Sequence, residues 1–358
     1  MAELFSRHMP TFQTRRFVSS IVGKLPSLEL KERVSLVADA LHETLPENKA
    51  DRFRILEAVL HPDDENRENA DSDSEGLCGW GVWPLTHLIG AYGIRDFEVS
   101  LELLREITKR GTSEFDVRHF IVADQTRAFR ILESWKDDPN HHVRRLISEG
   151  TRPRLPWGIR LNSLVRDPNP GIALLQYLKD DPSEYVRRSV ANHLNDIAKD
   201  HPKLVAELAA EWTKNASKQR KRLLRHACRT LIKQGHSETL TVFGYKEPKI
   251  AEPELGLSPK KVLFGEELQL QLVITSNHSR VQKLVIDYVV HFQKSNGSLS
   301  PKVFKWSNIE LSAGETKFLK KAHSFVPITT RKYYPGKHTI TTRINGLDFA
   351  AEPFDLIM

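Results

Sequence analysis

The sequence DPNHHVRR at residues 138–145 recurs as DPSEYVRR at residues 181–188. The offset of 43 residues matches the period of ~40–47 residues at which HEAT-type helical pairs repeat. The Asp-Pro turns the chain into the second helix of each pair, the valine faces the neighbouring repeat, and the arginines lie on the other side. A looser copy, KQRKRLLRHACR, stands at residues 218–229. The pattern predicts a curved helical solenoid.

Asp96 and Gly111 mark the two ends of another predicted helix in this half. Between them, apolar residues at positions 97, 101, 104 and 107 fall on one face. Asp is a favoured N-cap residue, and Gly is favoured where a helix ends in the left-handed conformation. We therefore expect a packed helix that Asp96 caps and a left-handed Gly111 closes.

Beyond Leu255 the hydrophobic spacing changes from helical to alternating. Apolar residues take every second position at 268–274 and 286–292, and turn sequences such as Asn296-Gly297 follow. Strands at this spacing, in about a hundred residues, predict an antiparallel β-sandwich. We therefore expect a multidomain α + β chain with an all-α repeat solenoid at 1–245, a linker at 246–254 and the sandwich at 255–358.

The composition is that of a soluble globular protein, with 39% hydrophobic and 28% charged residues. No apolar run reaches the ~18 residues that cross a bilayer, and the first residues lack the apolar stretch of a secretory signal. We expect no membrane contact, a cytoplasmic location and a monomer. Cys78 and Cys228 lack the paired spacing of a zinc site, so we expect no metal and no cofactor. The acidic run at 63–76 predicts an exposed loop.

The net charge of +7 favours a polyanionic partner, because Lys and Arg that neutralise phosphates release condensed counterions. Stacked helical pairs set their second helices side by side, where basic residues can form one concave surface for a phosphate backbone. Alternatively, these arginines form salt bridges between repeats. We expect one arginine of each pair to bridge repeats and the other to face the ligand. The residues concerned are Arg144, Arg145, Arg187, Arg188, Lys221, Arg222 and Arg225.

The first copy of the repeat breaks off in the run EGTRPRLPW at residues 149–157, where a glycine and two prolines replace a helical turn. Glu149 is thereby left near a helix C-terminus, where the macrodipole disfavours a carboxylate by ~0.3–1 kcal/mol. Local rules that are broken without a structural gain are expected at functional sites. In the alternative interpretation, Trp157 is a core anchor and Glu149 pairs with Arg152 or Arg154.

Glu114 and a tryptophan-rich segment are less informative by themselves. In TSEFD at residues 112–116, Glu114 occupies the first turn of a predicted helix, where a carboxylate is favourable anyway. Ser113 and Asp116 also have the spacing of a capping box. The segment GWGVWPL at residues 79–85 places two tryptophans before a helix, where they more often pack than stack on bases.

Together, the Val-Arg-Arg repeats, the segment SEGTRPRLPW (148–157), the segment GWGVWP (79–84) and the appended sandwich resemble AlkC-type DNA glycosylases, which have HEAT-like repeats and are related to AlkD. The resemblance covers nearly the whole chain, and EGTRPRLPW is its most specific part. It implies an immunoglobulin-like sandwich and a monofunctional, bacterial enzyme of base excision repair. The implied reaction is hydrolysis of the N-glycosidic bond of cationic bases, such as 3-methyladenine and 3-methylcytosine, in duplex DNA without base flipping.

Carried over residue by residue, the resemblance implies Glu149 and Glu114 as active-site carboxylates and Trp157 as the aromatic against the damaged nucleotide. A cationic N3-alkylated base is already a good leaving group, so carboxylates need only stabilise oxocarbenium character and position a water. The resemblance also implies that the sandwich contacts DNA, and Lys and Arg outnumber Asp and Glu there, 16 to 11 after Tyr245. Further expected DNA contacts are Arg152, Arg154, Lys260 and Lys261.

Two other functions stay open on the sequence. A non-catalytic HEAT-repeat protein can bind bent or branched DNA without cutting it. A protein-interaction solenoid would require the concave arginines to meet acidic peptides. The presence of Glu149 and Trp157 favours the enzyme over the non-catalytic DNA-binding protein, and salt-dependent binding to plain duplex DNA would argue against the interaction solenoid.

Overall fold

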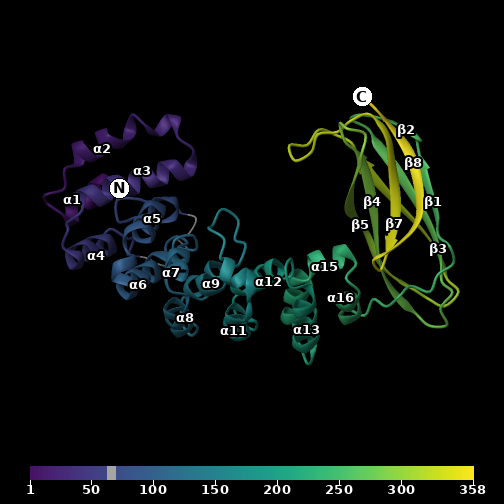
Figure 1. Cartoon of the computed structure of the whole chain (residues 1–358), viewed down its shortest axis with the longest axis horizontal. Helices are drawn as coiled ribbons and strands as arrows, with labels where there is room; N and C mark the ends of the chain where they lie inside the picture. Colours follow the sequence, from purple (N-terminus) through teal and green to yellow (C-terminus); the bar gives the residue numbers. More distant parts are fainter. Residues whose placement is uncertain (63–69) are drawn as a thin grey trace. The chain divides into compact units, whose positions relative to one another are not determined.

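A computed structural model describes residues 1–62 and 70–358 and shows two compact units, Met1–Asp200 (unit 1) and His201–Met358 (unit 2), coloured by sequence in Figure 1. Of the predicted acidic loop at 63–76, residues 63–69 lie outside the described residues. Residues 70–76 carry neither helix nor strand, in agreement with a loop. Across residues 1–62 and 70–358, no helix has the length and apolarity needed to cross a membrane.

The secondary-structure elements that the described residues of unit 1 form are helices, as the repeat pattern predicts. Its helices are α1 (Ala2–His8), α2 (Thr14–Val22), η1 (Leu25–Ser27), α3 (Leu30–Thr44), α4 (Lys49–Ala58), η2 (Gly79–Val82), α5 (Trp83–Tyr92), η3 (Ile94–Asp96), α6 (Phe97–Thr108), α7 (Val117–Ala123), α8 (Gln125–Ser134), α9 (His141–Gly150), α10 (Asn162–Arg166), α11 (Asn169–Leu178) and α12 (Glu184–Ile197).

The two copies of the repeat fold alike, on α9 and α12. The Asp138 carboxylate accepts the Asn140 N–H at 2.8 Å, and the Asp181 carboxylate accepts the Ser183 N–H at 2.8 Å. Such a turn satisfies a backbone donor just before each helix begins. The valines of both copies are fully buried, and α9 packs on α12. The predicted helical pairing is therefore confirmed for these two copies.

The helix that was expected between Asp96 and Gly111 exists as α6 and has Asp96 at its N-cap position as predicted, but the predicted closure by Gly111 is wrong. Asp96 precedes it without a side-chain capping bond and instead pairs with Lys49 Nζ at 2.7 Å. The helix ends at Thr108, followed by Lys109 in a right-handed conformation, and Gly111 is not left-handed. The glycine is needed for another reason, which concerns the pocket described below.

Unit 2 contains four further helices before its strands: α13 (Pro202–Thr213), α14 (Lys218–Ala227), α15 (Arg229–Gln234) and α16 (Ser237–Val242). The helical pattern therefore ends at Val242 and the strands begin at Glu254, while the compact units divide between Asp200 and His201. The division into 1–245, 246–254 and 255–358 follows secondary structure and stays a prediction.

The strands of unit 2 form two sheets (Figure 1), as the alternating pattern predicts. One sheet has the order β1-β3-β6 and the other β2-β8-β7-β4-β5. Their inward residues form one apolar core. The strands are β1 (Glu254–Ser258), β2 (Lys261–Leu263), β3 (Glu267–Thr275), β4 (Gln282–Gln293), β5 (Leu299–Leu311), β6 (Thr316–Ser324), β7 (Gly336–Ile344) and β8 (Leu347–Ile357).

Candidate active site

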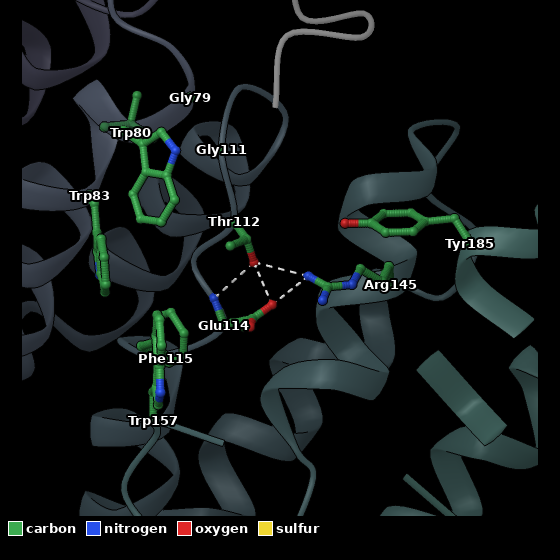
Figure 2. A pocket seen from close by; sticks show the side chains of 11 residues that line it. Gly79, Trp80, Trp83, Gly111, Thr112, Glu114, Phe115, Arg145, Trp157 and Tyr185 are labelled. Carbon is green, nitrogen blue, oxygen red and sulfur yellow. Dashed lines mark hydrogen bonds and ion pairs between the residues drawn. The ribbon is translucent and has the colours of Figure 1, made fainter. Parts of the chain in front are cut away.

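A pocket of about 420 Å³ opens in unit 1 where five segments meet (Figure 2). Aromatic side chains make one wall, and a carboxylate, a hydroxyl and a guanidinium face them from the other side. The lining residues are Gly79, Trp80, Val82, Trp83, Gly111, Thr112, Glu114, Phe115, Arg145, Trp157 and Tyr185. Within residues 1–62 and 70–358, no group of His, Cys, Asp and Glu is arranged to hold a metal ion.

The aromatic wall consists of Trp80, Trp83, Phe115 and Trp157. Ring centroids lie 5.4 Å apart for Trp80 and Trp83 and 5.5 Å apart for Trp83 and Phe115. Trp157 lines the same pocket and is labelled in Figure 2. Trp80 and Trp157 are 66% and 65% exposed, and exposed apolar side chains that gather in this way are typical of binding surfaces.

The turn that carries Trp80 depends on close backbone approach. Gly79 has φ 54° and donates its N–H to Arg110 O at 2.9 Å. A Cβ at Gly111 would lie 2.6 Å from Val82 Cγ2 and 2.8 Å from the Gly79 carbonyl oxygen. Gly111 is therefore required by packing against this turn, not by a left-handed helix end.

The polar side of the pocket is built around Glu114. Its Oε2 accepts hydrogen bonds from Thr112 Oγ1 at 2.9 Å and from Arg145 Nη1. Arg145 also donates to Thr112 Oγ1 at 3.1 Å and lies 4.9 Å from the Tyr185 ring centroid. Among the described residues, none donates a hydrogen bond to Glu114 Oε1, so this oxygen is available to a ligand or water.

The sequence context predicts Glu114 in the first turn of a helix, but this prediction is wrong. Helix α7 begins at Val117, so Glu114 belongs to the connection before it. The expected capping box is also wrong, because Ser113 Oγ donates to Leu104 O at 2.8 Å and Asp116 accepts from Thr86 Oγ1 at 2.6 Å. Ser113 and Asp116, on either side of Glu114, are thus hydrogen-bonded to α6 and α5. The side chain of Glu114 between them lines the pocket.

Glu149 lies behind the pocket and does not line it. It stands at the end of α9, as expected, and its side chain is buried. Oε1 pairs with Arg152 and lies 3.6 Å from Arg145 Nη2, while Oε2 accepts from Ser189 Oγ at 2.6 Å. The predicted pairing with Arg152 is thus present.

Burial opposes ionisation of Glu149, but the charges of Arg145 and Arg152 and the Ser189 hydrogen bond outweigh it. The pKa of Glu149 consequently lies below its ordinary value. Arg145 therefore forms ion pairs with both Glu114 and Glu149, through Nη1 and Nη2 respectively. The arrangement fixes the guanidinium at the pocket and keeps Glu149 charged.

Trp157 lies in the loop that interrupts the repeat, and it is not a core anchor. Its backbone has φ 66°, a left-handed conformation that non-glycine residues rarely adopt. Lys31 Nζ, on α3, donates to the Trp157 carbonyl oxygen. The indole is held at the pocket with little burial of its own.

The two arginines of the first copy take different places, and the expected bridge between repeats is made by one of them. Arg144 bridges to Asp181 of the next repeat at 2.6 and 3.0 Å, whereas Arg145 lines the pocket. In the second copy, Arg187 donates to the Pro182 carbonyl of its own turn at 2.9 Å, and Arg188 is exposed.

The remaining expected DNA contacts of unit 1 are occupied by ion pairs. Arg152 donates to Asp196 at 2.8 Å as well as to Glu149, and Arg154 donates to Asp200 at 2.6 and 2.7 Å. Arg152 is buried, so its observed partners are inside the protein. Arg154 is only half-buried.

The candidates in unit 2 lie on α14 and near β2. Lys221, Arg222 and Lys261 are exposed. Arg225 donates to Tyr245 Oη at 2.8 Å, and Lys260 pairs with Glu352. The single concave surface expected for α9, α12 and α14 spans both units and stays a prediction.

Sequence reasoning missed several residues that line the pocket. The tryptophan-rich segment was interpreted as packing, yet Trp80 and Trp83 form part of the wall. Thr112, Phe115 and Tyr185 carried no sequence signal of their own. The unusual pair of glycines around Trp80 was the one available sign, since it indicates a tight turn with an exposed ring.

Comparisons with known proteins agree with this architecture. Residues 251–358 match the family described as the C-terminal Ig-like domain of the uncharacterised protein YhaZ. The chain is 38% identical over 339 residues to the uncharacterized protein YhaZ of Bacillus subtilis, covering 94% of this chain and 90% of that protein.

A solved structure extends the likeness to the whole chain. It is the alkylpurine DNA glycosylase AlkC of Pseudomonas fluorescens, bound to DNA that contains an abasic site analogue. It superposes with a TM-score of 0.90 at 34% sequence identity, covering 100% of this chain and 96% of that one. The chain therefore belongs to the AlkC family, together with YhaZ.

Proposed function

We propose that this chain is a DNA glycosylase that hydrolyses the N-glycosidic bond of cationic alkylated bases in duplex DNA. The observation that carries the proposal is the Glu114 carboxylate, held at an aromatic-walled pocket with one oxygen available. The likeness to an alkylpurine DNA glycosylase over the whole chain supports the same function.

Glu114 acts directly on the reacting sugar in this proposal. As the bond to the base breaks, positive charge grows on the deoxyribose, and a carboxylate in a partly water-excluded pocket stabilises it. Oε1 is the oxygen that faces the sugar or aligns the attacking water. The bonds from Thr112 and Arg145 to Oε2 fix the carboxylate so that it need not reorganise during the reaction.

Glu149 acts through Arg145 and is a positioning residue in this proposal. It lies one layer behind Glu114 and is bound by Arg152 and Ser189, so its oxygens are already occupied. Its negative charge partly offsets that of Arg145, which would otherwise oppose a cationic substrate beside Glu114.

The aromatic wall contacts the damaged nucleotide. The exposed rings of Trp80 and Trp157 provide faces for stacking or for a cation–π contact of ~0.5–2 kcal/mol with the charged base. Because the described residues that line the pocket include no carboxylic acid or histidine besides the ion-paired Glu114, neutral bases such as uracil are expected to be poor substrates. The lesions that fit are 3-methyladenine and 3-methylcytosine, excised without flipping the base into the protein.

Basic residues of both units are proposed to bind the phosphate backbone. Arg188, Lys221, Arg222 and Lys261 are exposed and suited to this role. Arg144 and Arg187 are bound to the turns of the repeats and are proposed to stabilise the solenoid instead. We further propose that the protein acts as a cytoplasmic monomer on chromosomal DNA.

The test is base release from duplex DNA treated with N-methyl-N-nitrosourea, measured for the wild type and for Glu114→Gln, Glu149→Gln and Trp157→Ala. Wild type is expected to release 3-methyladenine. Glu114→Gln should bind DNA as well as wild type yet release almost none. Glu149→Gln should retain more activity than Glu114→Gln. Tight DNA binding by wild type without release would replace this proposal with the non-catalytic scaffold.

A further inference from the structure

Arg118, on α7, is the largest fully buried side chain among the described residues of this protein. Within the described chain, its guanidinium donates only to backbone carbonyl oxygens. Nε donates to Ile159 O at 2.8 Å, Nη2 donates to the same oxygen, and Nη1 donates to Gly150 O at 2.8 Å. One side chain thus joins two points that lie nine residues apart in the chain.

The burial of this charge is costly. No carboxylate forms an ion pair with Arg118 within the part of the chain that the structure describes, and burial together with the nearby Arg152 lowers its pKa to about 10. A buried guanidinium is tolerated only when its donors are satisfied. The guanidinium is therefore buried without a carboxylate partner, and its hydrogen bonds fix two backbone carbonyl groups.

Those two carbonyl groups bracket the loop that carries Trp157. Gly150 is the last residue of α9, and Ile159 follows Trp157 by two positions. Between them, Gly158 leaves room for the guanidinium, because a Cβ there would lie 3.1 Å from Arg118 Nε. The loop between Gly150 and Ile159 therefore packs against Arg118 at both ends, and Lys31 Nζ donates to the Trp157 carbonyl oxygen within it.

Arg118 also stands just after the segment that brings Glu114 and Phe115 to the pocket. Residues 112–118 hence contribute the carboxylate, one ring of the aromatic wall and the anchor of the opposite loop. We propose that Arg118 is a positioning residue that sets the distance and orientation of Trp157 relative to Glu114. The expected effect on excision rests on the proposed glycosylase function, whereas the anchoring of the loop by Arg118 does not depend on it.

Without the anchor, Trp157 would leave its left-handed conformation, since that conformation is strained and the ring is mostly exposed. A displacement of about 1 Å in a positioning group can slow a reaction by about 10²-fold. The phosphate-binding surface would be unaffected, so DNA affinity and excision should respond differently.

The test compares Arg118→Met and Arg118→Lys with wild type and with Arg52→Met. Arg52 is a matched control, because it also donates to a backbone carbonyl, Pro46 O at 2.9 Å, in the same unit but outside the pocket lining. Gly158→Ala is a milder variant that presses on the guanidinium without removing it. The readouts are amide hydrogen exchange, affinity for undamaged duplex, and single-turnover excision of a methylated base.

Both Arg118 variants are expected to speed exchange at residues 151–161 at least tenfold while α5 and α6 stay protected. Excision should fall about 10²-fold, and affinity for undamaged duplex should change less than threefold. Arg118→Lys should not rescue, because one ammonium group cannot span both carbonyls. Gly158→Ala should move in the same direction, and Arg52→Met should match wild type.

Unchanged exchange at 151–161 would overturn the anchoring role. Full excision despite a released loop, or full rescue by Arg118→Lys, would overturn the positioning role. Should wild type excise nothing, the proposed function fails, whereas the exchange result still decides whether Arg118 anchors the loop.

Discussion

Replacing Glu149 with Gln tests whether the carboxylate behind the pocket stabilises unit 1 as the geometry requires. Gln keeps the shape and the acceptor for Ser189 but removes the charge that faces Arg145 and Arg152. Breaking a buried ion pair outright costs about 3–5 kcal/mol. Here each arginine retains a second carboxylate, Glu114 or Asp196. We therefore expect a smaller loss of about 1.5–3 kcal/mol, the range for hydrogen bonds to charged groups.

For a compact unit of about 200 residues, this loss corresponds to a melting temperature lowered by roughly 3–12 °C. The assay is thermal and urea unfolding followed by tryptophan fluorescence, with Glu133→Gln as the matched control because Glu133 is exposed on α8. The control should melt within about 1 °C of wild type, as is usual for surface substitutions.

The stabilisation by Glu149 should depend on pH in a defined direction. Since folding lowers the pKa of Glu149 below its ordinary value of 4.5, its contribution is fully present above that value. It is lost as the pH falls through the lower, folded-state pKa. The difference between wild type and Glu149→Gln should hence be constant from pH 6 to 8 and shrink in acid below about pH 4.5. Equal stability at pH 7, or a difference that persists unchanged in acid, would refute this reasoning.

Three further substitutions separate the roles around the pocket. Trp157→Gly should leave stability unchanged or slightly raised, because φ 66° suits glycine and the ring is exposed, while base release falls at least tenfold in the excision assay. Trp80→Leu should keep the melting temperature and weaken binding to damaged duplex by about 1–3 kcal/mol in fluorescence anisotropy, the range for lost base stacking. Gly111→Ala, whose Cβ would meet Val82 at 2.6 Å, should lower the melting temperature, whereas Gly23→Ala, with nothing within 4 Å, should not. Unaltered release by Trp157→Gly, unaltered binding by Trp80→Leu or equal melting of the two glycine variants would each contradict the corresponding assignment.

The spacing of apolar residues predicted the architecture, because the residues that set the local helix or strand period are also those that pack in the core. The repeated Asp-Pro turn and buried valine define both α9 and α12, and the alternation at 268–274 defines β3. Strand β8 was missed because Pro353 interrupts its pattern. A proline is acceptable there, since β2 pairs only with residues 355–357 and leaves that part of β8 open on one side.

The site was only partly predictable, for a physical reason. Glu149 and Trp157 gave a signal because they lie in a sequence that breaks the repeat. Glu114 gave no signal of its own, since a carboxylate in the first turn of a helix is ordinary, and only the family resemblance indicated it. Which carboxylate reaches the pocket depends on pairs between residues far apart in the sequence, Arg145 with Glu114 and Arg152 with Asp196. Such long-range pairing leaves no spacing in the sequence.

The most direct test of the central claim is single-turnover release from two defined duplexes, one with a single cationic 3-methylcytosine and one with a single neutral uracil. The wild-type protein should bind both duplexes with affinities within about tenfold and release 3-methylcytosine alone, because the pocket supplies a carboxylate but no acid for the leaving base. Binding without release of either base, or equal release of uracil, would contradict the account.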